Sequence, residues 1–167
     1  ARLKKDRRME ELEQFALNDS MTGMYNRNAY DYFVKNEKDF EGYVIVTFDL
    51  NNLKQCNDQY GHRAGDEYII NAAHIIEDNF ERYGKCYRIG GDEFCCIIPK
   101  GRHFKIERVM HKIDQDVEIL NHKNIIPVPV GIAYGYAVFT ADDTDPEKVR
   151  ERADKDMYRN KKTMKQS

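Results

Sequence analysis

The chain has 167 residues, of which 41% are hydrophobic and 34% are charged. This length and composition fit one domain with its own core, and they exclude a wholly disordered chain. The 27 basic and 29 acidic residues give a formal net charge of −2. Proteins that coat nucleic acids are usually basic, so we expect no nucleic-acid partner. No apolar run approaches the ~20 residues that cross a bilayer, so we expect no membrane contact by this segment.

The cysteines form neither a CxxC pair nor a zinc-binding spacing; they are Cys56, Cys86, Cys95 and Cys96. We therefore expect reduced, buried thiols in a cytoplasmic protein. The chain starts at Ala1 without an initiating methionine. We expect it to be a piece of a longer protein, and the cytoplasmic part of a membrane-anchored protein would fit as well.

Residues 1–18 form the first unit that the pattern predicts. The segment from Leu3 to Asn18 lacks glycine and proline, and its apolar residues recur at spacings of three and four: Met9, Leu12, Phe15 and Ala16. This spacing predicts a helix with a narrow apolar stripe, too short to form a stable coiled coil alone. Two interpretations stay open. The helix packs on its own domain, or it is the end of a signalling helix that links to an upstream sensor domain.

Residues 19–167 form the second predicted unit, in which helical and strand patterns mix. A loop rich in Asp, Ser, Gly and Asn leads into a short helix that ends near residue 36. Apolar runs predict strands at 43–50, 86–89, 93–98 and 130–138, and helical spacing predicts helices at 52–60, 64–80, 104–120 and from 146 onward. Gly90 and Gly91 predict a hairpin between the middle strands. We expect an α+β domain with one central mixed or antiparallel sheet wrapped by helices.

The expected strand at 130–138 has one face of large residues and one of small residues. The small face consists of Gly131, Ala133, Gly135 and Ala137. Another element should therefore pack closely against it. Pro127 and Pro129 suggest a strand start or a sheet edge. In the following helix, Asp145 is the expected N-cap and Pro146 the first residue.

Two carboxylate sites stand out. Asp49 ends the central strand, and Asp92 and Glu93 follow the hairpin tip. If the hairpin pairs with the central strand, Asp49 and Asp92 converge, and a hard cation such as Mg²⁺ between them would relieve their repulsion. A helix start just after Asp49 offers amides for a phosphate group, those of Asn52, Leu53 and Lys54. The alternative is a turn aspartate and a hairpin aspartate that share no role.

The stretch Arg88-Ile-Gly-Gly-Asp-Glu-Phe94 resembles the signature of the GGDEF domain, the diguanylate cyclase family. Three further blocks follow the family's order and spacing. Residues 19–27 resemble the opening motif D-x-L-T-G-L-x-N-R. Residues 49–66 resemble D-x-D-x-F-K-x-x-N-D-x-x-G-H-x-x-G-D, and residues 153–165 resemble A-D-x-A-L-Y-x-A-K-x-x-G-R. Together the four blocks cover essentially the whole chain after about residue 18.

This resemblance implies a fold related to nucleotide-cyclase and polymerase palm domains. It also implies that a homodimer condenses two GTP molecules into cyclic di-GMP, with Mg²⁺ or Mn²⁺ and release of pyrophosphate. Asp49, the carbonyl of Leu50 and Asp92 match the family's metal ligands. Asp92 also matches a residue proposed to help deprotonate the attacking 3′-hydroxyl, and Glu93 matches a supporting acid.

The resemblance also assigns substrate contacts. Asn57 and Asp66 match the guanine-reading pair, and a carboxylate suits the donors at guanine N1 and the 2-amino group. His62 lies near that pocket in the family, and Lys161 matches a phosphate-binding lysine, with Lys165 where the family usually has Arg. Ordinary structural roles stay open for each: helix caps, a turn histidine, a solvated helix end, and a surface lysine at position 54.

Three departures from the motifs bear on activity. Asn51 replaces the second Asp of the D-x-D block, and Met164 and Lys165 replace Gly-Arg. The product-inhibition motif R-x-x-D is missing, since Glu81 and Gly84 stand in its place. Two functional hypotheses follow. The protein is an active diguanylate cyclase, or it is a catalytically weak or inactive GGDEF module that binds GTP and regulates a neighbouring domain.

Overall fold

The structure is a computed structural model that describes residues 7–11 and 16–166, and for residues 162–166 it describes the backbone alone. Its four strands form one antiparallel sheet in the order β2-β3-β1-β4. The strands are β1 (Val44–Leu50), β2 (Lys85–Arg88), β3 (Glu93–Ile98) and β4 (Ile132–Val138). The helices are α2 (Arg27–Asn36), α3 (Leu53–Tyr60), α4 (His62–Phe80), α5 (Ile106–His122) and α6 (Pro146–Gln166).

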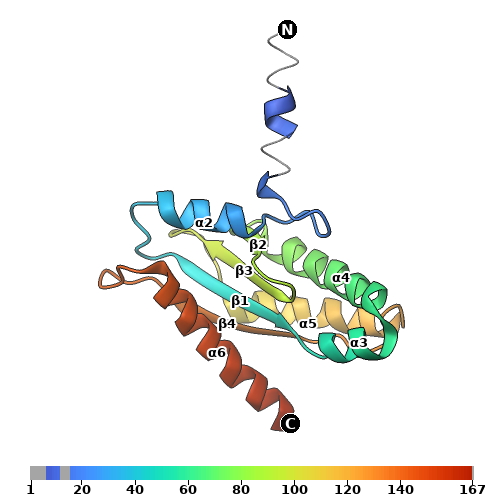
Figure 1. Ribbon diagram of the computed structural model, residues 1–167. Helices are drawn as coiled ribbons and strands as arrows, with labels where there is room; N and C mark the ends of the chain where they lie inside the picture. Colours follow the sequence, from blue (N-terminus) through green and yellow to red (C-terminus); the bar gives the residue numbers. More distant parts are fainter. Residues whose placement is uncertain (1–6, 12–15, 167) are drawn as a thin grey trace.

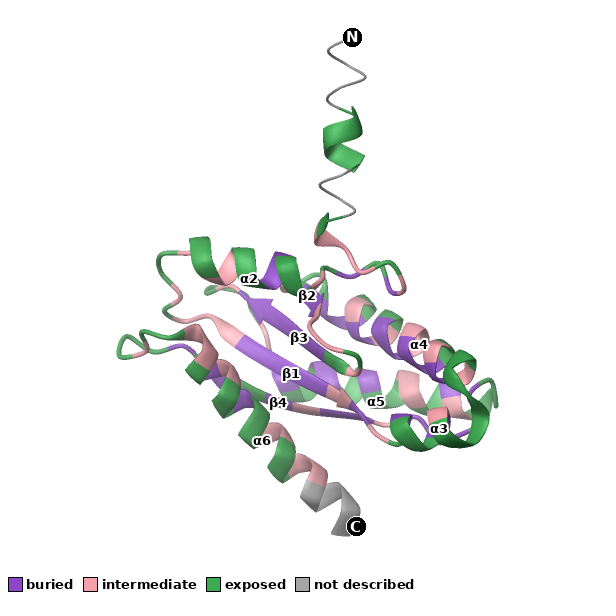
Figure 2. Ribbon diagram, in the orientation of Figure 1, coloured by how far each residue is buried: buried purple, intermediate pink, exposed green. Residues whose placement is uncertain are grey.

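Helices cover both faces of this sheet (Figure 1). Alternate residues of β1 point to opposite faces. Val46, Phe48 and Leu50 join a core cluster with residues of α3, α4 and α5. Ile45 joins a second cluster with residues of α2 and α6. Figure 2 shows the buried central strands between these two layers. The sequence therefore predicted the α+β class and the helix-wrapped antiparallel sheet correctly.

The elements expected within residues 19–167 all form, with ends that move by one or two residues. The hairpin across Gly90 and Gly91 joins β2 to β3. Cys95 and Cys96 lie in different core clusters, and all four cysteines are buried and free. One boundary differs for a clear reason. Asn52 has φ +66°, which is left-handed backbone, so α3 begins only at Leu53.

Another element packs closely against the small face of β4, as predicted, and that element is α6. A Cβ on Gly135 would stand 2.1 Å from the backbone nitrogen of Met157 and 2.2 Å from the carbonyl oxygen of Ala153. Only glycine allows the two backbones to approach this closely. At the start of the helix, the carboxylate of Asp145 accepts the N–H of Glu147 at 3.0 Å, which confirms the expected cap.

The expected N-terminal helix is only partly within the described residues. Residues 7–11 are helical, and Met9 is 61% exposed. Two other members of the predicted stripe, Leu12 and Phe15, lie outside the described residues. Within the described part of the chain, no helix combines the length and apolarity needed to cross a membrane.

Candidate active site

Asp49 lies near the C-terminal end of β1, between Glu93 of β3 and Ala133 of β4 in the strand register. One carboxylate oxygen accepts the N–H of Leu50 at 2.9 Å. The other forms an ion pair with the ammonium group of Lys161, which α6 brings to this edge of the sheet. The side chains of Lys161 and Asp49 are only 27% and 20% exposed, so water screens this pair less than a surface pair.

Asp92, at the tip of the β2–β3 hairpin, lies beside Asp49. Burial raises the pKa of Asp92 above its usual range, and the negative charge of Asp49 raises it further. The two carboxylates therefore converge, as the sequence suggests for a hairpin paired with the central strand. Glu93 follows on β3 and is exposed. The resulting pair of carboxylates, with one lysine, forms an acidic edge suited to a cation.

Arg88 fixes the hairpin tip that carries Asp92. Its guanidinium donates to the carbonyl of Gly91 at 2.9 Å and forms an ion pair with Asp19 at 3.1 Å. Asp19 also accepts the N–H and the hydroxyl of Thr22. Although burial opposes it, these hydrogen bonds from Thr22 and Arg88 lower the pKa of Asp19. The sequence showed the motif that begins at Asp19 and the motif that begins at Arg88, but it gave no sign that these two residues pair.

Tyr68, which is fully buried, holds the loop between β1 and α3 in place through hydrogen bonds. The Tyr68 hydroxyl donates to the carbonyl of Asn51 at 2.6 Å and accepts the N–H of Gly131 at 2.9 Å. The N–H of Asn51 donates to the Gly131 carbonyl at 2.8 Å. Three hydrogen bonds thus fix the loop that leads from Asp49 to the first turn of α3. Sequence reasoning missed Tyr68, because an apolar helix face gives no sign of a buried hydroxyl.

The first turn of α3 is where the sequence predicts phosphate contacts. Asn52 and Lys54 are exposed, whereas the Leu53 side chain is 7% exposed and anchors the helix in the core. The amides of this turn are orphan donors that face outward from the helix end. Asn52 makes no side-chain capping hydrogen bond here, so the turn stays a candidate phosphate site.

The predicted guanine-reading residues lie on adjacent helices. Asn57 belongs to α3 and Asp66 to α4, and both are partly buried. A Cβ on Gly65 would stand 1.7 Å from the side-chain oxygen of Asn57, so glycine is required for this approach. His62 is exposed in the first turn of α4. The structure brings Asn57 next to the turn that carries Asp66.

The two predicted phosphate lysines have different outcomes. Lys161 contacts Asp49, so it already lies at the acidic edge. The side chain of Lys165 lies outside the described residues. The Asn51 side chain, which replaces an acid of the motif, packs against Gly131.

The family's sequence model, described as diguanylate cyclase, GGDEF domain, matches residues 16–167. The chain belongs to the GGDEF domain family. This confirms the resemblance that the four motifs carry.

Curated relatives support the same assignment. Diguanylate cyclase DgcS of Shewanella oneidensis is 28% identical over 160 residues, which are 91% of this chain and 52% of DgcS. The bifunctional diguanylate cyclase/cyclic di-GMP phosphodiesterase MucR of Pseudomonas aeruginosa is 30% identical over 157 residues, or 89% of this chain and 22% of MucR. This GGDEF chain therefore spans about half of DgcS and a smaller part of MucR.

A solved structure with the same fold is that of the coiled coil and GGDEF domain of DgcB from Caulobacter crescentus in complex with c-di-GMP. The TM-score is 0.78 at 23% identity, over 96% of this chain and 88% of that one. This likeness shows the fold, which matches the palm-like architecture that the resemblance implies.

GGDEF diguanylate cyclases are nucleotidyltransferases that generally need a divalent metal. The donor set of this chain fits such an ion. Burial and then the negative charge of Asp49 raise the pKa of Asp92, and the ammonium group of Lys161 pairs with Asp49. Among the described residues, no cluster of three or more His, Cys, Asp or Glu side chains could form a closed protein cage. Two carboxylates without a cage are typical of Mg²⁺ sites that take substrate phosphates as further ligands.

Proposed function

We propose that this domain is a diguanylate cyclase that condenses two GTP molecules into cyclic di-GMP. The observation that carries the proposal is the convergence of Asp49 and Asp92 at the edge of a GGDEF domain, beside the open first turn of α3. In each half-reaction, a 3′-oxygen forms a bond to the α-phosphorus of the other GTP. The bond between the α- and β-phosphates breaks, pyrophosphate leaves, and the proton of the hydroxyl passes to a base.

The chain's own residues would divide this work. Asp49, the Leu50 carbonyl and Asp92 would hold Mg²⁺ or Mn²⁺, which supplies neutralisation of phosphate charge when bound. The amides of the first α3 turn and the ammonium group of Lys161 would bind the phosphates. The amides donate hydrogen bonds and carry a partial positive charge, and the ammonium group carries a full one. Asp92 would accept the hydroxyl proton, and Glu93 would add negative charge nearby.

The guanine base would bind between α3 and α4. Asp66 would accept the hydrogen bonds of guanine N1 and the 2-amino group, and Asn57 would pair with the remaining edge. The close packing of Asn57 on Gly65 supports this assignment, because it brings the Asn57 amide to the turn that carries Asp66. His62 is exposed at the same turn and would line the rim.

Catalysis would need two copies of the domain. One domain offers one acidic edge and one base site, so it binds one GTP, whereas a cyclic product needs two α-phosphates and two attacking hydroxyls. We propose that residues 19–167 form this catalytic domain and that residues 1–18 link it to an upstream sensor in the full-length protein. A device that holds two domains together raises the effective concentration of the second site.

Product analysis tests the proposal. The domain, alone and fused to a dimeric coiled coil, is incubated with GTP and Mg²⁺ or Mn²⁺, and the products are identified by mass spectrometry. We expect cyclic di-GMP and two pyrophosphates per product, with specific activity that rises on fusion. GTP binding without turnover by the fused protein would instead favour the regulatory module, which Asn51 at the position of a motif acid makes the second candidate.

A further inference from the structure

The outer edge of β4 is closed by side chains of α6 rather than by another strand. β4 is an edge strand of the sheet. Asn160 donates to the carbonyl of Tyr134 at 2.7 Å, and Asp156 accepts the N–H of Tyr136 at 3.0 Å. At the far end, Arg152 donates to the carbonyl of Val138 at 3.0 Å.

These bonds form a regular ladder because two periodicities match. The α6 residues are four apart, which is one helical turn, or ~6 Å along the axis. Their β4 partners are two apart in the opposite chain direction, which is ~6.8 Å of strand. The α6 side chains therefore reach around the edge of β4 at every turn. A slip of α6 along the sheet would break all these bonds together.

From residue 154 to residue 161, α6 reaches the sheet through polar contacts and through the close approach of its backbone to Gly135 at Met157. Val149 and Ala153 are fully buried in the core, but no residue from 154 to 161 is buried. The motif that this segment resembles carries alanine at both positions where this chain has Asp156 and Asn160. Fully buried side chains thus end about two turns before Lys161, and the ladder continues to the residue just before it.

We propose that Asp156 and Asn160 are positioning residues that hold α6 in register so that Lys161 reaches Asp49 and, in the proposed cyclase, the phosphates of GTP. The inference rests on the proposed function for the role of Lys161. Asn160 fixes the backbone one residue before Lys161, and Asp156 fixes the preceding turn. Neither side chain needs to touch the substrate for this effect.

The test is a set of variants measured by two methods. Amide hydrogen exchange reports the protection of residues 157–161. Fluorescence titration with Mg²⁺ and a GTP analogue that has a methylene group between its α- and β-phosphates reports affinity without turnover. Asp156→Ala and Asn160→Ala should lower the protection and weaken analogue binding by about three- to tenfold each, the usual scale for one lost hydrogen bond. Alanine favours helices more than Asp or Asn does, so helix propensity alone predicts the opposite change in protection.

Two controls separate positioning from charge and from general stability. Asp156→Asn removes the charge but keeps an acceptor for the Tyr136 N–H, so it should bind the analogue as the wild type does. Lys155→Ala changes an exposed residue of the same helix and should alter neither readout. The decisive measurement is a double-mutant cycle with Lys161→Ala. In that background, Asp156→Ala and Asn160→Ala should weaken binding no further.

The outcomes separate this inference from the proposed function. Additive losses in the cycle, unchanged protection at 157–161, or an Asp156→Asn variant as weak as Asp156→Ala would overturn the positioning role even if cyclic di-GMP is made. A coupled cycle in a protein that binds the analogue but forms no cyclic di-GMP would support the positioning role and reject the cyclase. A wild type that does not bind the analogue would reject both.

Discussion

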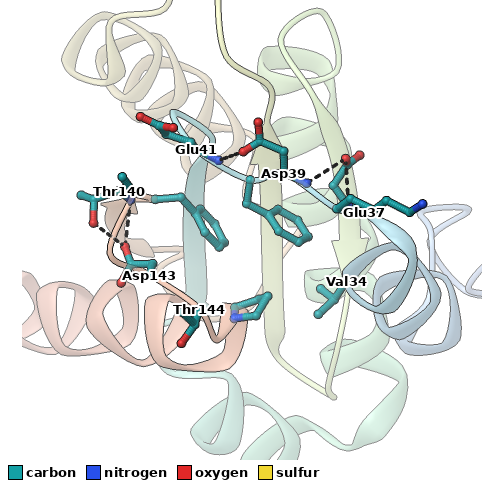
Figure 3. A pocket seen from close by; sticks show the side chains of 12 residues that line it. Val34, Glu37, Asp39, Glu41, Thr140, Asp143 and Thr144 are labelled. Carbon is teal, nitrogen blue, oxygen red and sulfur yellow. Dashed lines mark hydrogen bonds between the residues drawn. The ribbon is translucent and has the colours of Figure 1, made fainter.

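Carboxylates gather at both ends of β1, yet the two ends differ in how those carboxylates are satisfied. At the C-terminal end, Asp49 and Asp92 lie side by side. Near the N-terminal end, acidic residues line a pocket between the loop that follows α2 and the loop that precedes α6 (Figure 3). In that pocket, Glu37 accepts the N–H of Asp39, and Asp39 accepts the N–H of Glu41 at 3.0 Å.

The pKa shifts at the two ends run in opposite directions. Near the pocket, a hydrogen bond from Arg152 and then one from the Thr140 N–H hold the pKa of Asp143 well below its usual range. At the other end, burial and the charge of Asp49 raise the pKa of Asp92. An acidic cluster whose members cap loops and bind arginine is complete within the fold. At the other end, the pKa of Asp92 stays raised although Lys161 pairs with Asp49, so a further cation at the proposed metal site would stabilise that cluster.

The largest expected effect tests this difference directly. Asp49→Asn or Asp92→Asn should lower cyclase turnover by about a hundredfold or more, because each removes charge from the proposed metal site. Neither change removes core volume, so both variants should stay folded, with a lower thermal unfolding midpoint only for Asp49→Asn, which removes the ion partner of Lys161. The measurement is the rate of cyclic di-GMP formation by the dimerised domain.

Asp39→Asn is the matched control at the other end of β1. It makes the same chemical change and keeps an acceptor for the Glu41 N–H. Its turnover should equal that of the wild type. Equal losses in all three variants would mean that the two ends do not differ in function, and the comparison would break.

A second, smaller effect concerns recognition of the guanine base of GTP. Asp66→Ser should lower the preference for GTP over ATP by about tenfold or more, since a hydroxyl pairs with either purine whereas a carboxylate needs donors. Turnover of each nucleotide by the dimerised variant gives the ratio. Glu67→Ser is the control, because Glu67 is the exposed neighbour on the same helix. An unaltered ratio in Asp66→Ser would remove Asp66 from the base site.

Much of the site could be predicted because its residues lie in short, contiguous motifs. Strand and hairpin patterns alone suggested that Asp49 and Asp92 meet, since pairing of the hairpin with β1 brings their ends together. The small face of β4 predicted in the same way that another element packs closely there, and the structure shows that this element is α6. In both cases, the deciding signal is local and periodic.

What could not be predicted are contacts between polar groups far apart in the chain. Tyr68 and Gly131 are 63 residues apart, and Arg88 and Asp19 are 69 apart. Such pairs depend on side-chain direction within the finished fold. The left-handed backbone of Asn52 was missed for a related reason. The neighbouring residue Asn51 is held by a hydrogen bond to Gly131, which is far away in the sequence.

A third prediction concerns how the free energy of unfolding depends on pH through Asp143, near the N-terminal end of β1. The pKa of Asp143 is lowered in the folded state, so its ion pair with Arg152 stabilises the fold above about pH 4. That contribution is lost as the pH falls through the lowered pKa. Ion pairs near the protein surface contribute about 0.2–1 kcal/mol. The difference in unfolding free energy between wild type and Asp143→Asn should therefore shrink from pH 6 to about pH 2 in urea titrations. A constant difference would show that the pair is not charged in the way the structure indicates.

The last prediction is that cyclic di-GMP does not inhibit the enzyme through the family's usual site. Glu81 and Gly84 stand where the family's product-inhibition motif has Arg and Asp, so cyclic di-GMP should not inhibit through that site. Glu81 is exposed and would repel the product's phosphates. The backbone also opposes restoration of the motif, because a Cβ at Gly84 would stand 2.1 Å from the carbonyl oxygen of Ile97. Initial rates at rising cyclic di-GMP should stay constant at saturating GTP, both in the wild type and in the double variant Glu81→Arg, Gly84→Asp. Glu81→Arg alone is the control for the added charge. Inhibition of the wild type that saturating GTP does not relieve would contradict the prediction. It would mean that cyclic di-GMP binds at a site built from residues other than Glu81 and Gly84.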